Sequence, residues 1–420
     1  MEKLIVKGGK RLVGTVKTSG AKNAVLPIIA ASIMGTSPSH FDEVPMLEDV
    51  RTISEVLRSL GIEVESKEKN CLDIDSTVVE SYEPPCELMR NMRASFFVMG
   101  PLLARMGKAR IYMPGGCAIG ARPVDIHLKG FEALGVVLDQ QDGFIEATTP
   151  NGLKGATIYF DFPSVGATEN VMMAAALAEG VTILENAAEE PEIVALASYL
   201  NKMGAKIRGA GTDVIRIEGV KELHGADYTI IPDRIEAGTY MIAAAMTGGD
   251  VIVDNVLPEH QKPLIAKLRE AGAIVEEDID KVRVIGNGTL KGVSVKTLPY
   301  PGFPTDMQPQ IAVALGLSGG TSIVTESIFE NRFKYVDELT KMGGNVKVEG
   351  NTAIIVGVPK YTAANIVAPD LRAGAALVMA GLNADGRTEI SGIEFIDRGY
   401  QNIEGNLSKC GAKIKRIHIQ

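Results

Sequence analysis

Two patterns of apolar and polar residues recur along the whole chain. The first is a helix end that closes on an apolar residue and a glycine and is followed by an alternating strand, as in LRSLGIEVE and LNKMGAKIR. Glycine suits this position because helices commonly end with one residue in the left-handed conformation, where a Cβ is unfavourable. The pattern predicts amphipathic helices that end at six glycines, 68 to 74 residues apart: Gly61, Gly135, Gly204, Gly272, Gly343 and Gly411.

The second pattern is an apolar helix of small residues, followed by a glycine-rich turn and a β-branched strand. It appears as NAVLPIIAASIMG, ASFFVMGPLLARMG, NVMMAAALAEGVTILEN, TYMIAAAMTGGDVIVDN, QIAVALGLSGGTSIVTES and ALVMAGLNADGRTEISG. Alanine-rich helices can approach a sheet or one another closely, so we expect them to form the buried layer. Each repeat therefore reads as helix, strand, amphipathic helix, strand, with further strands near the repeat boundaries.

One such repeat cannot close a hydrophobic core alone, so the repeats must associate. The fold class expected is mixed α/β, with three repeats around a pseudo-threefold axis and this arrangement formed twice. An open solenoid of six repeats is the alternative. The mixed strands and the long irregular connections argue against it.

Composition narrows the functional classes. The 420 residues carry 43 Lys and Arg against 52 Asp and Glu, a net charge of −9, which gives no general affinity for nucleic acid or an acidic membrane. Any anionic ligand must therefore be held by a local cluster of cations. Four cysteines are too sparse for a disulfide framework or a metal pattern, so a reducing, cytoplasmic setting is expected. The five histidines include no pair at ligand spacing, and we expect neither a metal nor an organic cofactor.

Ala24–Met34 is an apolar run preceded by several lysines, which resembles a signal peptide. The repeat pattern favours a buried helix instead, because this run is the first of the six small-residue helices. No apolar run approaches the roughly 20 residues of a membrane span, so membrane insertion is not expected.

Cations stand at the expected N-termini of several small-residue helices. A cation there opposes the helix dipole by about 0.3–1 kcal/mol at an exposed site, which suggests that an anion lies between the cation and the helix end. Asp and Ser at such positions are ordinarily N-caps. The cations concerned are Lys22, Arg93, Arg234 and Arg372.

Three irregular loops follow the strands: Gly115–Asp125, Glu326–Phe333 and Ser391–Tyr400. The first presents Cys117 beside Arg122, a cation that would lower the pKa of the thiol. Cys71, Cys86 and Cys410 are interpreted as small buried hydrophobes, and His127 as a structural hydrogen-bonding group. Six cations occupy equivalent ends of different repeats and together indicate a cleft for a small polyanion: Lys22, Arg93, Arg122, Arg332, Arg372 and Arg398.

At these residues the chain resembles the enolpyruvyl transferase family over its whole length. The resemblance rests on SGAKNAVLPIIAA, MRASFFVMGPLLAR, GGCAIGARPVDIHLKG, SVGATEN, PDRIEAGTYMIAAA, YPGFPTDMQPQ, IFENRF, APDLRAGAALV and DRGYQNIE. It implies an inside-out α/β barrel of six βαβαββ-type repeats, three in each of two domains. Residues 22–229 would form one domain, residues 1–21 plus 230–420 the other, and the active site would lie in the cleft between them.

The resemblance also implies a reaction. Enolpyruvyl would pass from phosphoenolpyruvate to the 3′-hydroxyl of UDP-N-acetylglucosamine, releasing phosphate through a tetrahedral ketal, as the first committed step of peptidoglycan synthesis. By the same resemblance, Lys22, Arg122 and Arg398 clamp the phosphate and carboxylate of phosphoenolpyruvate, supported by Arg93 and Arg372. Such an anion could not be left unpaired in a dry cleft.

Catalytic roles are implied in the same way. Cys117 would take part in proton transfer and form a covalent adduct with phosphoenolpyruvate, and fosfomycin would alkylate it. Its loop would act as a lid. Asp306 would act as base toward the sugar hydroxyl, Asp370 would assist proton shuttling, and Asn23 would hydrogen-bond the hydroxyl or the intermediate.

The nucleotide-sugar is expected along Arg122, Pro123, Val124 and Asp125, and along Ser164, Val165 and Gly166. His127, Ile328 and Arg332 are further substrate-binding candidates. One departure from the family pattern concerns Phe162, where some relatives carry a lysine. A charge on the uridine diphosphate side would then be supplied differently here.

Two other interpretations remain open. The sister enzyme, 5-enolpyruvylshikimate-3-phosphate synthase, shares the fold and the donor, but typically has Lys-Ser where this chain has Lys22-Asn23 and lacks the loop cysteine. A non-catalytic scaffold that binds anions would leave the Cys117 loop and the cationic cluster unexplained.

Overall fold

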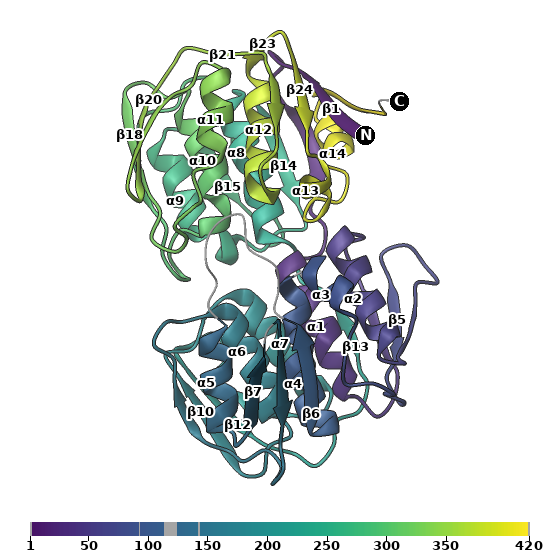
Figure 1. The fold of residues 1–420 in the computed structure, drawn as a ribbon. Helices are drawn as coiled ribbons and strands as arrows, with labels where there is room; N and C mark the ends of the chain where they lie inside the picture. Colours follow the sequence, from purple (N-terminus) through teal and green to yellow (C-terminus); the bar gives the residue numbers. More distant parts are fainter. Residues whose placement is uncertain (1, 92, 113–123, 142, 419–420) are drawn as a thin grey trace. The chain divides into compact units, whose positions relative to one another are not determined.

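The computed structural model describes residues 2–91, 93–112, 124–141 and 143–418 (Figure 1). These residues form two compact units. One combines the residues up to Ser19 with those from Pro232 onward, and the other lies between Gly20 and Ile231. Each unit has its own hydrophobic core. The expected domain boundaries at residues 21/22 and 229/230 stay a prediction.

The unit between Gly20 and Ile231 contains three sheets. Their strand orders are β13(Asp227–Thr229)–β3(Ser39–Asp42)–β5(Leu72–Asp75)–β4(Glu63–Glu65), β6(Lys108–Tyr112)–β8(Phe144–Thr148)–β7(Val137–Gln141) and β11(Lys206–Arg208)–β12(Val214–Glu218)–β10(Val181–Glu185)–β9(Thr157–Tyr159). The helices are α1(Lys22–Ala31), η1(Ser32–Met34), α2(Glu48–Ser59), α3(Cys86–Asn91), η2(Arg93–Val98), α4(Met99–Met106), α5(Asp125–Ala133), α6(Val165–Ala175) and α7(Pro191–Lys202).

The second unit repeats this plan with three four-stranded sheets and one short ribbon. The strand orders are β15(Ile274–Glu277)–β16(Lys281–Ile285)–β14(Asp250–Asp254)–β2(Val13–Lys17), β17(Ser294–Lys296)–β18(Thr321–Thr325)–β20(Thr352–Val356)–β19(Asn345–Glu349), β22(Asn365–Val367)–β24(Arg387–Ser391)–β1(Glu2–Lys7)–β25(Lys413–His418) and β21(Tyr361–Thr362)–β23(Ala384–Asp385). The helices are α8(Arg234–Met246), η3(Pro258–Gln261), α9(Lys262–Glu270), η4(Thr305–Met307), α10(Gln308–Leu315), α11(Tyr335–Lys341), α12(Leu371–Leu382), α13(Glu394–Asp397) and α14(Ile403–Lys409).

The predicted helix ends are confirmed. Each of the six signature glycines follows the C-cap of an amphipathic helix, and each has a positive φ, between 80° and 107°. The helices that end there are α2, α5, α7, α9, α11 and α14. This conformation places the chain for the strand that follows, as the repeat pattern requires.

The predicted buried layer is also confirmed. Every residue of α8 and α10 is buried, as are all residues of α12 except Leu371. Within the second unit α10 packs against both α8 and α12, and the three sheets lie outside this helical centre (Figure 1). One expected helix differs: the chain before α4 forms the 3₁₀ helix η2. Helices inside and sheets outside give an inside-out α/β arrangement.

Pairings between distant segments close each unit. In Figure 1 the N-terminal strand β1 lies beside β24, and it pairs antiparallel with both β24 and β25. Strand β2 pairs parallel with β14, and β13 pairs parallel with β3. An open solenoid would leave these edges unpaired, so the structure excludes that alternative.

The apolar run Ala24–Met34 forms α1 and η1, and all of its residues are buried. The run is therefore a core helix, as the repeat pattern predicts. Within the described parts of the chain, no helix has the length and apolar character needed to cross a membrane.

Candidate active site

In the second unit, Asp306 lies between two buried arginines. Arg332 Nη2 donates to Asp306 Oδ1 at 2.8 Å, and Arg372 Nε and Nη2 donate to Oδ2 at 3.2 and 3.0 Å. Both arginine side chains are at most 4% exposed, against 23% for that of Asp306. One carboxylate thus bonds two largely buried guanidinium groups.

The two arginines also hold donors that the protein does not use. Arg332 Nε and Nη1 and Arg372 Nη1 are buried and have no hydrogen-bond partner among the described residues. A buried unpaired donor is costly, particularly on a charged group. Burial lowers the pKa of Arg372, but Asp306, Tyr400 and Asp233 together outweigh it, and the pKa of Arg372 is raised. These donors therefore fit an anionic group that the described residues do not supply.

Asp370 caps the helix that carries Arg372. Its side chain accepts hydrogen bonds from the backbone N–H groups of Arg372 and Ala373 at 2.9 and 3.0 Å. The Arg372 guanidinium lies 5.6 Å from the centre of the Tyr400 ring. The Tyr400 hydroxyl is held in turn by Thr239 and Gln310. The Asp370 cap therefore fixes the backbone of Arg372, and the Tyr400 ring packs against its guanidinium group.

Arg398 is the C-cap residue of the short helix α13 and is partly buried. The next residue, Gly399, packs closely against Leu371, since an added Cβ would lie 2.6 Å from Leu371 Cδ1. The segment that carries Arg398 therefore packs directly on the start of α12, one residue before Arg372.

The loop that carries Ile328 and Arg332 is anchored by Glu326, which is 2% exposed. Glu326 Oε1 accepts from Thr297 Oγ1, Ile328 N and Phe329 N at 2.9, 2.8 and 3.2 Å. Its Oε2 accepts from Thr305 Oγ1 at 2.9 Å. Because Thr305 precedes Asp306, this one carboxylate fixes Asp306 and the Arg332 loop relative to each other.

In the other unit, Lys22 is the first residue of α1, and its Nζ lies 2.9 Å from Asp49 Oδ2. Asp49 belongs to the first turn of α2 and is buried. The sequence predicts an anion beside a cation at this helix end, and the Asp49 carboxylate is one. Asn23 follows Lys22 in the first turn of α1 and is partly buried.

A second group forms at the start of α6. Ser164 is the N-cap residue and accepts a hydrogen bond from Ala167 N at 3.4 Å, and Val165 and Gly166 open the helix. A Cβ on Gly166 would lie 3.2 Å from His127 Cε1, so glycine makes room for the imidazole. His127 Nδ1 lies 3.4 Å from Asn170 Nδ2, and its ring meets Phe96 edge-on.

Val124 is the N-cap residue of α5 and Asp125 its first residue, close in sequence to His127. Phe162, at the position where some relatives carry lysine, is 42% exposed. Cys117, Arg122 and Pro123 lie outside the described residues. Arg93 begins η2, and its side chain lies outside the described part as well.

Among the described residues the structure thus brings together two sets of predicted side chains, one around Asp306 in the second unit and one around α5 and α6 in the other. Sequence reasoning missed Asp49, Glu326 and Asn170. Glu326 is the first residue of the irregular loop Glu326–Phe333, so it could have been predicted from the sequence. Asp49 and Asn170 look like ordinary helix residues until their neighbours are known.

One further interpretation is wrong. Cys71 and Cys86 are partly exposed rather than buried, and only Cys410 is buried. Cys410 occupies an apolar slot of the repeat pattern, whereas Cys71 precedes a strand of an outer sheet and Cys86 starts α3.

Comparison with known proteins supports one family. The family model described as EPSP synthase (3-phosphoshikimate 1-carboxyvinyltransferase) matches residues 6–407. UDP-N-acetylglucosamine 1-carboxyvinyltransferase 1 of Halalkalibacterium halodurans is 58% identical over 418 residues, 99% of this chain and 95% of the relative. UDP-N-acetylglucosamine 1-carboxyvinyltransferase 2 of Carboxydothermus hydrogenoformans is 59% identical over 99% of this chain and all of the relative. The enzyme of that name from Finegoldia magna is 56% identical over the full length of both chains.

Solved structures share the fold. The enolpyruvyl transferase NikO from Streptomyces tendae superimposes with a TM-score of 0.88 at 25% identity, over 99% of this chain and 98% of that one. EPSP synthase from Acinetobacter baumannii gives 0.77 at 21% identity over 99% of both chains, which supports the fold alone. The fold is the inside-out α/β barrel that the resemblance implies. With a family-model match over most of its length and near-full-length relatives, the chain belongs to the enolpyruvyl transferase family.

Proposed function

We propose that the protein transfers enolpyruvyl from phosphoenolpyruvate to the 3′-hydroxyl of UDP-N-acetylglucosamine and releases phosphate. The observation that carries this proposal is the identity of 56–59% over nearly the whole chain to relatives named for that activity. The EPSP synthases of known structure are much less similar in sequence, at 20–21% identity. The acceptor is therefore the nucleotide-sugar and not shikimate 3-phosphate.

The donor is a small polyanion, and the proposed clamp for it is Lys22, Arg122 and Arg398, supported by Arg93 and Arg372. The unused buried donor of Arg372 supports this role, since a phosphate or carboxylate oxygen would satisfy it. An oxygen that replaces a missing partner gains more than one that competes with an existing hydrogen bond. Whether residues of both units act on the same donor molecule stays a prediction.

Asp306 is the proposed base that takes the proton of the sugar hydroxyl. Two guanidinium groups bond its carboxylate oxygens and fix its position. We infer that substrate anions compete with the carboxylate for Arg332 or Arg372, which frees a carboxylate oxygen to accept the hydroxyl proton. The unused donors on both arginines give substrate anions a place to do so.

The chemistry balances in two steps. The hydroxyl oxygen attacks C2 of phosphoenolpyruvate as its proton leaves to the base, and a proton is added to the C3 methylene, giving a tetrahedral ketal with a methyl group. The ketal then loses a C3 proton as the bond from C2 to the phosphate oxygen breaks, which regenerates the double bond and releases phosphate. We assign C3 proton transfer to Cys117 with help from Asp370, and hydrogen bonding to the hydroxyl or the ketal to Asn23.

The nucleotide-sugar is assigned to the α5 and α6 starts and to the Ile328 loop. The residues are Arg122, Pro123, Val124, Asp125, His127, Ser164, Val165, Gly166, Ile328 and Arg332. The N-termini of α5 and α6 support this assignment, because helix N-termini favour the negative charge of a diphosphate. We place the enzyme in the cytoplasm, at the first committed step of peptidoglycan synthesis, and hence in cell wall biogenesis, cell shape and cell division.

The acceptor can be tested by phosphate release from phosphoenolpyruvate with either UDP-N-acetylglucosamine or shikimate 3-phosphate. Release with the nucleotide-sugar alone is expected. Phosphate release with shikimate 3-phosphate would instead assign 5-enolpyruvylshikimate-3-phosphate synthase activity. No phosphate release with either acceptor would favour a non-catalytic scaffold that binds anions.

Fosfomycin tests the role of Cys117 separately from turnover. Incubation with fosfomycin should abolish activity and add one inhibitor mass to the intact chain. Cys117→Asp should take up no inhibitor, whereas the control Cys86→Ser should be modified like wild type. Modification of the Cys117→Asp variant would place the reactive thiol elsewhere.

A further inference from the structure

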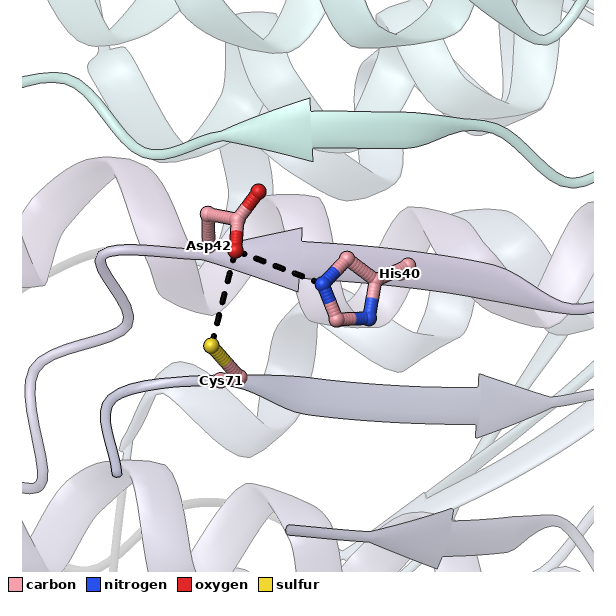
Figure 2. A group of neighbouring side chains, drawn as sticks. All are labelled: His40, Asp42 and Cys71. Carbon is pink, nitrogen blue, oxygen red and sulfur yellow. Dashed lines mark hydrogen bonds and ion pairs between the residues drawn. The ribbon is translucent and has the colours of Figure 1, made fainter. Parts of the chain in front are cut away.

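A cluster of His40, Asp42 and Cys71 lies on the β3–β5 pair, away from the residues of the proposed active site (Figure 2). Asp73 adjoins this cluster through His40. The origin of the cluster is the pairing register, which sets His40 opposite Asp73 and Phe41 opposite Leu72. Side chains alternate between the two faces of a strand. Phe41 and Leu72 therefore enter the core, and the polar residues next to them share the outer face.

Three side chains of this cluster converge on one point. Asp42 Oδ1 lies 3.3 Å from His40 Nε2 and 3.4 Å from Cys71 Sγ, and all three ligand atoms lie within 4.8 Å of one another. Ligand bonds to zinc are about 2.0 Å for nitrogen or oxygen and 2.3 Å for sulfur, so ligands of a tetrahedral ion lie about 3.3–3.6 Å apart. Both separations that Asp42 makes fall in that range.

Asp73 adds the support that metal-binding histidines usually have. Its Oδ1 lies 2.7 Å from His40 Nδ1. A carboxylate at one ring nitrogen fixes the proton there and leaves the other nitrogen as a lone-pair donor. In this structure the nitrogen left over is Nε2, the one that faces Asp42.

The charges around the cluster also favour a cation. Asp227 is the neighbour of His40 across the β13–β3 pair, and Glu65 is the neighbour of Asp73 across the β4–β5 pair. Two lysines lie near these carboxylates: Lys67 is 3.0 Å from Glu65 and 3.8 Å from Asp73, and Lys202 Nζ donates to the carbonyl of Asp227 at 3.2 Å. The four carboxylates outnumber the two lysines. The side chains of His40 and Asp42 are 41% and 50% exposed, so an ion can enter from solvent.

We propose that His40 Nε2, Asp42 Oδ1 and Cys71 Sγ bind one divalent transition metal ion, best matched by Zn²⁺, with Asp73 as a positioning residue. A nitrogen, oxygen and sulfur set suits zinc better than magnesium or calcium, which prefer oxygen alone. With three protein ligands, the fourth position belongs to water. The site lies between a strand and the residue before its partner strand, so the ion would cross-link the two.

The sequence did not suggest this site because its ligands are not at a metal-binding spacing. His40 and Asp42 are separated from Cys71 by a helix and a strand, α2 and β4. Only the antiparallel register of β3 and β5 brings them together.

The test is titration of the chelator-treated, full-length protein with Zn²⁺, and with Co²⁺ as a spectroscopic probe of thiolate ligation. Wild type should bind one equivalent and show a thiolate-to-cobalt charge-transfer band. Cys71→Ser should remove the band, and Cys71→Ser and His40→Gln should each weaken Zn²⁺ binding at least tenfold. Asp73→Asn should weaken it about 10–100-fold while leaving the band in place at saturation.

Matched controls separate this site from other thiols and imidazoles. Cys86→Ser, Cys117→Ser and His224→Gln should bind like wild type; His224 is exposed, and its ring is bonded to the carbonyl of Gly225. Circular dichroism verifies folding, and Asp42→Asn, at an exposed position, provides a second ligand variant should Cys71→Ser misfold. Unchanged binding in Cys71→Ser and His40→Gln, a band that disappears in Cys117→Ser, or no binding by wild type would each overturn the proposal.

Discussion

At the scale of single residues, Asp306 holds the second unit's site together. It is the only carboxylate among the described residues that is shown bonded to both Arg332 and Arg372, so its replacement by asparagine removes the carboxylate that bonds two buried guanidinium groups. We expect Asp306→Asn to lower kcat by at least 100-fold, as for loss of a general base. The free energy of unfolding should fall by about 1–3 kcal/mol.

The matched control is Asp337→Asn, an exposed aspartate in the first turn of α11. Steady-state kinetics should find this variant close to wild type. If Asp306→Asn retained kcat within threefold of wild type, Asp306 would not be the base.

A second residue predicts a pH dependence. Glu236, in the first turn of α8, is buried and accepts hydrogen bonds from Ser19 N and Oγ and from the Tyr240 hydroxyl. Burial raises the pKa of Glu236 to about 7, and the nearby Asp233 adds to the rise, although the hydrogen bonds from Ser19 oppose it. A folded-state pKa above the unfolded value means that the folded protein binds the proton more tightly.

Stability from this proton is therefore present below about pH 4.5 and is lost as pH rises through 7. Between pH 5 and pH 8, the free energy of unfolding of wild type should fall by up to about 3 kcal/mol more than that of Glu236→Gln, whose side chain cannot ionise. Denaturant unfolding at the two pH values measures this difference. Parallel pH profiles for the two proteins would contradict this assignment.

Single residues also show where sequence reasoning stops. Lys22 and Arg372 were predictable because a cation at a helix start is unusual enough to need a reason. The partner of Lys22 was not, because Asp49 is an ordinary acidic residue in the first turn of a helix until α2 packs beside α1. The sequence shows the chemistry of a single side chain, whereas the identity of its interaction partner depends on how the helices pack.

At the scale of elements, the six glycines that end the amphipathic helices are the strongest signal in the chain. Gly411 has φ +90°, and an added Cβ would meet only Arg11 O at 3.9 Å, an ordinary contact. Gly411→Ala therefore tests the backbone conformation without a clash. We expect a loss of about 1–2 kcal/mol in the free energy of unfolding, with catalysis unchanged.

Gly319→Ala provides the control in the same unit. Gly319 also has open space around a Cβ, with Leu290 O at 3.9 Å, and its φ is outside the left-handed region. Alanine there should change stability by no more than about 1 kcal/mol. Equal losses in the two variants would mean that the left-handed conformation is not what the repeat glycines provide.

Helices and their ends were predictable from the sequence, and strand partners were not. The glycine and alanine patterns depend only on residues close together in the sequence, so they predict helices and helix ends directly. The pairing of β1 with β24, or of β13 with β3, joins segments far apart in the chain, and many pairings satisfy the same alternation. The proposed metal-binding cluster of His40, Asp42 and Cys71 could not be predicted from the sequence for this reason.

At the scale of the whole molecule, repetition made the fold class predictable. Six repeats with buried small-residue helices require closure. In the second unit, β1 pairs with β24 and with the last strand, β25, and β2 pairs with β14. Two buried arginines, Arg332 and Arg372, converge on Asp306 in a chain that is acidic overall, and such a local cluster of cations is what an anion site in this chain needs. The fold and the close relatives thus support one account, an enolpyruvyl transferase whose acceptor is a nucleotide-sugar.

The most direct measurement is the mass of the acceptor after reaction with phosphoenolpyruvate, together with the amount of phosphate released. The account predicts that UDP-N-acetylglucosamine gains one enolpyruvyl group for each phosphate released, and that shikimate 3-phosphate gains none. Phosphate released while the nucleotide-sugar keeps its mass, or an unreacted mixture at saturating substrates, would contradict it.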